Sequence, residues 1–269
     1  MLYYTREVKY IMRSLADSFL IALSMYSILP VKNLNWTEKN MRYAMAFFPL
    51  VGLAEGAALY LVYKLCSALG TGSLLYSALS IFSLIFVTGG IHLDGFCDTA
   101  DALFSRRPTE QKLKILKDPN CGPFAVFSVI LVIMISAASF AEIYTREAQS
   151  YILLFTFGMF ITRTLSGFSV VTLKSTQTSS LAKIFGENAG RSVRYILIAE
   201  MMLASVFMTL KFGMMGAAEL VLTALVFLYY YFMQKKQFGG ITGDLAGFFL
   251  VLNETVWFLS AALFGGVLI

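Results

Sequence analysis

Long apolar runs are the feature that most limits how this chain can fold. A helix needs about 20 apolar residues to cross the hydrocarbon core of a bilayer. We identify seven runs of about that length, at 43–63, 67–91, 122–144, 150–171, 195–212, 213–233 and 245–269. A backbone in lipid must satisfy its own hydrogen bonds, which favours helices. The sequence therefore predicts an all-α, polytopic membrane protein with about seven transmembrane helices in one domain over residues 1–269.

Composition supports this class. Hydrophobic residues make up 58% of the chain and charged residues only 14%, whereas soluble domains carry about 25% charged residues. This balance excludes a soluble globular protein, a disordered chain and a disulfide scaffold. A shorter apolar run, Phe19 to Leu29, ends at Pro30. It suits a re-entrant or interfacial helix better than a span.

The basic residues indicate topology. They gather before residue 43 and in segments 105–118, 174–194 and 234–237, which seven spans place on one side. The positive-inside rule assigns that side to the cytoplasm. The net charge of +5 therefore reflects membrane orientation and not nucleic-acid binding. The bilayer is the expected environment, and the sequence leaves a homo-oligomer open.

Acidic residues concentrate in a short stretch at the end of the second run. Residues 89–101 hold Asp94, Asp98, Asp101 and the only histidine, His92. The spacing i, i+4, i+7 places the three carboxylates on one face of a helix. Three like charges repel one another unless a cation lies among them, and hard oxygen ligands suit Mg²⁺. The alternative is that Asp94 caps a helix and the others face water.

A basic loop follows this stretch. Arg106, Arg107, Lys117 and Asp118 precede Pro119. Beside an acidic metal site, such a loop is suited to bind a polyanionic substrate. Alternatively, it only marks topology and touches lipid phosphates.

A second stretch, Gly239 to Asp244, combines Gly240, Thr242, Gly243 and Asp244. Glycines allow backbone amides to approach a phosphate closely, although a turn that starts a helix has the same pattern. Two charged residues inside spans, Arg163 and Glu254, are further candidates because intramembrane charges are often functional. Arg163 needs either a buried anionic partner or a phosphate.

These blocks resemble a known family. His-Leu-Asp-Gly at 92–95, Cys-Asp-Thr-Ala-Asp at 97–101, Leu-Lys-Asp at 116–118 and Gly-Gly-Ile-Thr-Gly-Asp at 239–244 with Glu254 are similar to the signature of the cobalamin synthase family, also called adenosylcobinamide-GDP ribazoletransferase. Phe-Pro-Leu-Val-Gly at 48–52 and Thr162-Arg163 fit more weakly. The resemblance implies a magnesium-dependent enzyme of the bacterial cytoplasmic membrane. It would join adenosylcobinamide-GDP to α-ribazole, or its 5′-phosphate, and release GMP.

The implied chemistry assigns roles to the candidate residues. Asp94, Asp98 and Asp101 would hold magnesium on the diphosphate, and His92 would either take the hydroxyl proton or orient Asp94. Asp244 would hold a second metal or bind a substrate hydroxyl. The basic loop would offset charge on GMP.

Two other functions are open at this point. A phosphotransferase with CDP-linked donors also places aspartates at a helix end. Its pattern, Asp-Gly-x-x-Ala-Arg, includes an arginine that is absent after Asp94-Gly95 in this sequence. A cation-coupled transporter would use Glu55, Glu200, Glu219 and Glu254 as ion sites near the bilayer centre.

Overall fold

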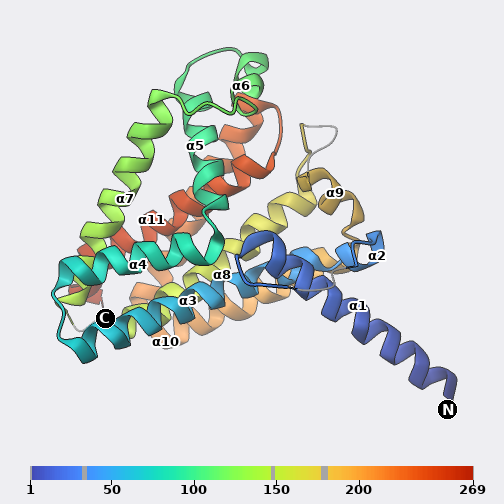
Figure 1. Cartoon of the computed structure of the whole chain (residues 1–269), viewed down its shortest axis with the longest axis horizontal. Helices are drawn as coiled ribbons and strands as arrows, with labels where there is room; N and C mark the ends of the chain where they lie inside the picture. The colour runs from blue at the N-terminus through green and yellow to red at the C-terminus, as the bar shows by residue number, and fades with distance from the viewer. Residues whose placement is uncertain (1, 32–34, 147–148, 177–180, 269) are drawn as a thin grey trace.

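The computed structural model describes residues 2–31, 35–146, 149–176 and 181–268. Parts of the predicted basic segments and the end of the last predicted span lie outside these ranges. The elements are α1 (Leu2–Tyr26), α2 (Glu38–Met41), α3 (Ala44–Leu69), α4 (Ser73–Thr88), α5 (Ile91–Phe104), α6 (Thr109–Ile115), α7 (Pro123–Tyr144), α8 (Gln149–Thr172), α9 (Leu181–Asn188), α10 (Arg191–Met233), the π-helix η1 (Gln234–Phe238) and α11 (Gly243–Leu268). The described residues form no strand, so the all-α prediction is confirmed (Figure 1).

Apolar helices long enough for a bilayer dominate the fold. Among the described residues, α3, α7, α8, α10 and α11 meet this requirement, and α4 with α5 adds a sixth span if this bent pair crosses as one. The protein is therefore a multi-pass membrane protein. The predicted number of seven spans is not confirmed by this count.

The long helix α10 contains a break. Its 43 residues would extend about 65 Å if straight, roughly twice the hydrocarbon thickness of a bilayer. Gly213 interrupts it with φ 54° and ψ −128°. A Cβ on Gly216 would lie 2.3 Å from the Met208 carbonyl oxygen, so the chain turns back on itself here. The break falls at the predicted boundary between residues 212 and 213.

A sharp bend separates α4 from α5. The two helices meet at 94°, and the two glycines between them have φ 64° at Gly89 and φ 76° at Gly90. Residues other than glycine rarely adopt this left-handed conformation. The predicted run 67–91 therefore ends as a helix at Thr88, and the acidic stretch begins a helix of its own in a new direction.

Most of the N-terminal apolar run, Phe19–Tyr26, forms the last third of α1, and the rest follows the helix. This helix is not among the candidate spans, and its first half projects away from the other helices (Figure 1). Its end packs against the α4–α5 bend, because the Ile28 amide donates to the Val87 carbonyl at 3.0 Å. The helix is thus longer than the predicted segment and reaches the centre of the fold.

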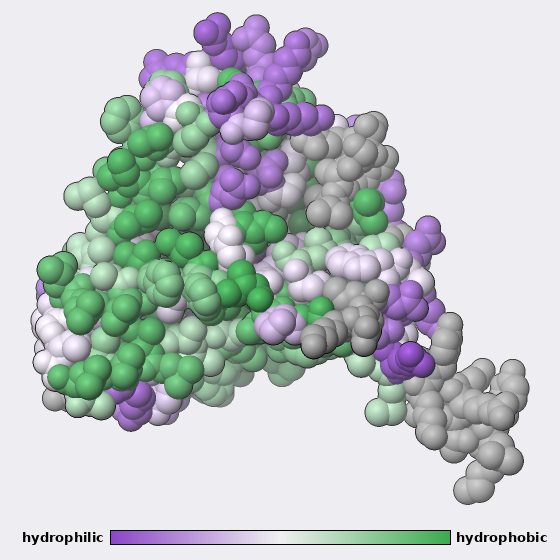
Figure 2. Space-filling model, viewed as in Figure 1, coloured by the Kyte–Doolittle hydropathy of each residue, from purple (hydrophilic) through white to green (hydrophobic). Residues whose placement is uncertain are grey.

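The surface separates apolar from polar regions. Figure 2 shows hydrophobic side chains across α4 and α7, whereas hydrophilic side chains gather at the end that carries α6. Large apolar side chains of α4 and α7 are exposed, such as Leu74, Phe82, Phe127 and Leu131. This distribution is typical of helices that face lipid.

Candidate active site

The helix α5 carries the acidic stretch, as the spacing predicted. Its N-cap is Gly90, and Asp94 lies in the first turn. Asp94 is therefore not the capping residue, which removes part of the alternative interpretation. Asp94, Asp98 and Asp101 follow one another along one face of this helix.

Close packing of α5 against α11 brings the two sequence stretches together. A Cβ on Gly95 would lie 2.9 Å from the Asp244 Cα, and one on Gly247 would lie 3.1 Å from the His92 carbonyl oxygen. Only residues without a side chain permit this approach. Asp244, in the first turn of α11, consequently lies beside the acidic face of α5.

The four carboxylates act on one another electrostatically. The negative charges of Asp94, Asp244 and Asp101 repel that of Asp98. Asp101 also lies against the start of α7, since a Cβ on Gly122 would fall 2.1 Å from its Oδ2. Within the described ranges no lysine or arginine forms an ion pair with any of the four.

The donor chemistry of this cluster fits magnesium, but its geometry is not that of a closed metal cage. No group of three or more His, Cys, Asp or Glu side chains in the described part of the chain is placed to hold a metal ion. Magnesium in phosphate-binding sites commonly takes one or two carboxylates, with waters and phosphates as its other ligands. A pair of these carboxylates therefore suffices for such an ion.

A cavity of about 180 Å³ lies beside two members of the cluster, Asp94 and Asp244. It is lined by Asp94, Asp244 and His92, and also by Tyr26 of α1 and Phe48 of α3. The Tyr26 and Phe48 rings lie 4.2 Å apart, centre to centre. The sequence did not predict Tyr26 as a site residue, and Phe48 appeared only in the weakly fitting block at 48–52. Nothing in the sequence around either residue indicates that its ring lies near His92.

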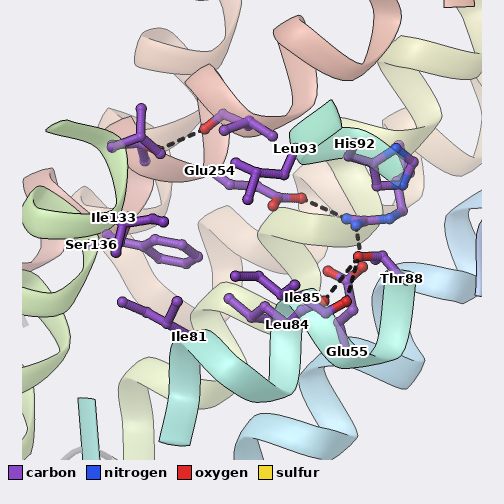
Figure 3. Close-up of a pocket in the computed structure, with 15 residues that line it drawn as sticks. Glu55, Ile81, Leu84, Ile85, Thr88, His92, Leu93, Ile133, Ser136 and Glu254 are labelled. Carbon is purple, nitrogen blue, oxygen red and sulfur yellow. Dashed lines mark hydrogen bonds and ion pairs between the residues drawn. The ribbon is translucent and has the colours of Figure 1, made fainter. Parts of the chain in front are cut away.

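His92 lies where two cavities meet. Its ring centre is 6.0 Å from that of Tyr26 and 5.8 Å from that of Phe48, and its Nε2 has no hydrogen-bond partner among the described residues. No hydrogen bond joins it to Asp94 in this structure. His92 also lines a second cavity, of about 80 Å³, between α4, α7 and α11 (Figure 3).

A buried ion-pair network lies in this second cavity. Arg163 of α8 is fully buried and binds Glu55 of α3 and Glu254 of α11, the latter at 2.6 Å. Figure 3 shows Glu55 and Glu254 at this cavity, and Leu84 and Ile133 form part of its apolar wall. Arg163 thus has the buried anionic partners that its sequence position required, and Glu254 binds a protein residue.

The second stretch starts α11, in agreement with the simpler interpretation of its glycines. The Leu245 amide donates to Thr242 Oγ1 at 3.2 Å. The stretch is anchored to the end of α8, because the Ile241 amide donates to the Lys174 carbonyl at 2.9 Å and the Thr176 amide to the Ile241 carbonyl at 3.2 Å. Gly243 is exposed beside Asp244 and lines the 180 Å³ cavity with it, whereas Gly240 does not line this cavity.

The basic loop lies at the hydrophilic end of the fold. Arg106, Arg107 and Lys117 are exposed. Hydrogen bonds from the Asn120 backbone and side-chain amides lower the pKa of Asp118, so this carboxylate stays ionised. The structure does not bring these residues into the cavity beside His92.

One lysine of this region has a role that its sequence position did not reveal. Lys112 of α6 is buried and donates a hydrogen bond to Gln237 of η1. Its ammonium lies 5.9 Å from the centre of the Phe238 ring. Lys112 therefore links the basic loop to the segment that leads into the second stretch.

Comparison with known proteins agrees with this arrangement. The Cobalamin-5-phosphate synthase family matches residues 18–262. The chain belongs to this family. The match includes every candidate residue, from His92 on α5 to Glu254 on α11.

Curated relatives match over nearly their whole length, and each is named adenosylcobinamide-GDP ribazoletransferase. The protein of Clostridium botulinum (strain Alaska E43 / Type E3) is 35% identical over 253 residues, which cover 94% of this chain and 100% of the relative. The Geobacillus sp. (strain WCH70) relative is 30% identical, covering 92% and 98%. That of Acinetobacter baumannii is 31% identical, covering 88% and 94%. No solved structure matches the chain.

Proposed function

We propose that this protein transfers the adenosylcobinamide phosphate group from adenosylcobinamide-GDP to α-ribazole or its 5′-phosphate. A ribose hydroxyl forms a new bond to the cobinamide-linked phosphorus, the pyrophosphate bond breaks, and GMP leaves with the bridging oxygen. The family match and the names of the relatives support this reaction over a CDP-dependent phosphotransferase or a transporter.

The observation that carries the proposal is the meeting of α5 and α11. These helices place Asp94 and Asp244, from stretches about 150 residues apart in sequence, on one cavity with His92. Phosphoryl transfer depends mainly on positioning and on offsetting the charge of the phosphates. An acidic cluster without protein cations is suited to this purpose only together with a bound cation.

Magnesium is the proposed cofactor. A pair among Asp94, Asp98, Asp101 and Asp244 would hold it, and the bound ion would supply charge neutralisation to the diphosphate oxygens. The repulsion among these carboxylates supports this assignment, because an ion between them relieves it.

His92 is the proposed general base. Its buried imidazole lines the same cavity as Asp94 and Asp244, and its Nε2 has no hydrogen-bond partner among the described residues. The absence of a hydrogen bond to Asp94 favours this role over orientation of that carboxylate. Arg106, Arg107 and Lys117 are proposed to bind the phosphate of GMP from the loop above.

We place the protein in the bacterial cytoplasmic membrane with the acidic cluster on the cytoplasmic side. The basic loop beside the cluster supports this orientation, because cytoplasmic loops collect lysine and arginine. The nucleotide substrate would then be available on the same side.

GMP release by purified protein in detergent tests the reaction. Release should require both substrates and magnesium, stop with EDTA, and return when magnesium is added back. Asp98→Ala should lower turnover at least about a hundredfold while the unfolding temperature stays close to wild type. The Asp17→Ala variant, which removes an aspartate of α1 that binds Asn40, is the control for loss of a carboxylate elsewhere. Wild-type turnover from folded Asp98→Ala protein would contradict the assignment.

A further inference from the structure

The cavity beside the acidic cluster has two chemically different ends. The wall supplied by α5 and the start of α11 carries Asp94, Gly243 and Asp244 (the carboxylate end), whereas the wall supplied by α1 and α3 carries Met25, Tyr26, Met45 and Phe48 (the aromatic end). The remaining walls include Val170 and Leu250. One end therefore suits phosphates and their cation, and the other suits an apolar ring.

We propose that the aromatic end of this cavity binds the planar base of the acceptor nucleoside. This inference rests on the proposed transferase function and assigns a subsite to one of its two substrates. Tyr26 and Phe48 would contact the base, and the ribose would then lie beside His92. The reacting hydroxyl would consequently face the phosphorus held at the carboxylate end.

The size of the cavity agrees with a small aromatic ring system. An apolar protein cavity of about 150 Å³ binds benzene, and this cavity measures about 180 Å³. A corrin macrocycle is several times larger and cannot enter. The corrinoid part of the donor must therefore lie outside the cavity.

The lining also distinguishes between the two bases of the reaction. Guanine carries several hydrogen-bonding groups on its edge, and burying them without partners is costly. The aromatic end offers side chains of methionine, phenylalanine and valine, and its polar groups are the hydroxyls of Tyr26 and the neighbouring Ser166. A base with few hydrogen-bonding groups, such as a benzimidazole, fits this surface better than guanine does.

The ring arrangement supports contact with an aromatic ligand. The Tyr26 and His92 rings are inclined by only 22°, with centres 6.0 Å apart, and the Phe48 ring meets His92 at 62°. Aromatic rings stabilise one another in both offset-stacked and edge-to-face contacts. A planar base beside these rings can make contacts of either kind.

Calorimetry of benzimidazole binding to the full-length protein in detergent tests this subsite. Phe48→Leu should weaken benzimidazole and α-ribazole binding about ten- to hundredfold, the range expected when an aromatic contact to a base is lost. Its neighbour Phe47 packs against Phe19 and does not line the cavity. Phe47→Leu, the matched control, should leave binding within about twofold of wild type. Val170→Phe, which fills the cavity without removing an aromatic ring, should also weaken binding.

The outcomes separate this subsite from the reaction itself. Equal benzimidazole binding by wild type, Phe48→Leu and Val170→Phe would overturn the inference, even if GMP release is normal. Weakened GMP binding with unchanged benzimidazole binding would also overturn it, because guanine would then be the occupant. Loss of benzimidazole binding in these variants, together with no GMP release by the wild type, would retain the subsite and reject the proposed reaction.

Discussion

Replacing Arg163 by methionine should destabilise the protein strongly, because it leaves two buried carboxylates without their cation. Arg163 is fully buried, Glu55 is 1% exposed and Glu254 is 15% exposed. Removal of one partner from a buried ion pair costs about 3–5 kcal/mol. For a chain of this size, 1 kcal/mol changes the unfolding temperature by roughly 2–4 °C. The expected decrease is therefore about 6–20 °C.

A second arginine–glutamate pair provides a matched control. Arg146 and Glu142 form an i, i+4 pair at 2.5 Å, with side chains 35% and 53% exposed. Such surface pairs contribute about 0–1 kcal/mol. Arg146 also donates to the Ala262 carbonyl at 2.9 Å, which adds about 1 kcal/mol. Arg146→Met should thus cost no more than about 2 kcal/mol.

Thermal unfolding in detergent, followed by the fluorescence of Trp36 and Trp257, measures both changes. A triple variant with Arg163→Met, Glu55→Gln and Glu254→Gln should recover most of the loss, because no buried charge is then left unpaired. An unfolding temperature of Arg163→Met within about 2 °C of wild type would refute the reasoning. An equal loss in Arg146→Met would refute it as well.

Two further pairs of variants test the packing around the acidic cluster. Gly95→Ala should lower the free energy of unfolding by about 1–3 kcal/mol and lower turnover, because the new Cβ would lie 2.9 Å from the Asp244 backbone. A Cβ on Gly243 would meet nothing within 4 Å, so Gly243→Ala should leave the unfolding temperature unchanged. Equal effects of the two variants would contradict this packing. Lys112→Met should cost about 1–3 kcal/mol because it leaves Gln237 without its buried partner, whereas the exposed Lys114→Met should change stability by less than about 0.5 kcal/mol. Urea unfolding of both lysine variants measures this difference, and identical midpoints would count against the link between α6 and η1.

The features predicted correctly from the sequence are those with a local signal. Apolar length predicted the membrane class, the i, i+4, i+7 spacing predicted the α5 helix, and the lone Arg163 required either a buried anionic partner or a phosphate. Each depends on a periodicity or on a charge that must be compensated wherever it lies. The helix break at Gly213 also coincided with a predicted boundary, since Lys211 and Gly213 interrupt the apolar run.

The features that were missed depend on contacts between distant segments. Tyr26 reaches the cavity because α1 docks on the α4–α5 bend, and neither its neighbours nor its spacing indicate this. The 94° bend itself follows from two adjacent left-handed glycines, whereas an apolar run only records length. The burial of Lys112 depends likewise on Gln237, 125 residues away.

Formation of the joined product by purified protein is the most direct test of the proposed reaction. Mass spectrometry and chromatography can follow the corrinoid and GMP together when both substrates and magnesium are supplied. We expect a corrinoid that carries the nucleoside, formed in the same amount as GMP, and neither product from folded Asp94→Ala protein. GMP without the joined corrinoid, or no turnover by well-folded wild type, would contradict the proposed transfer.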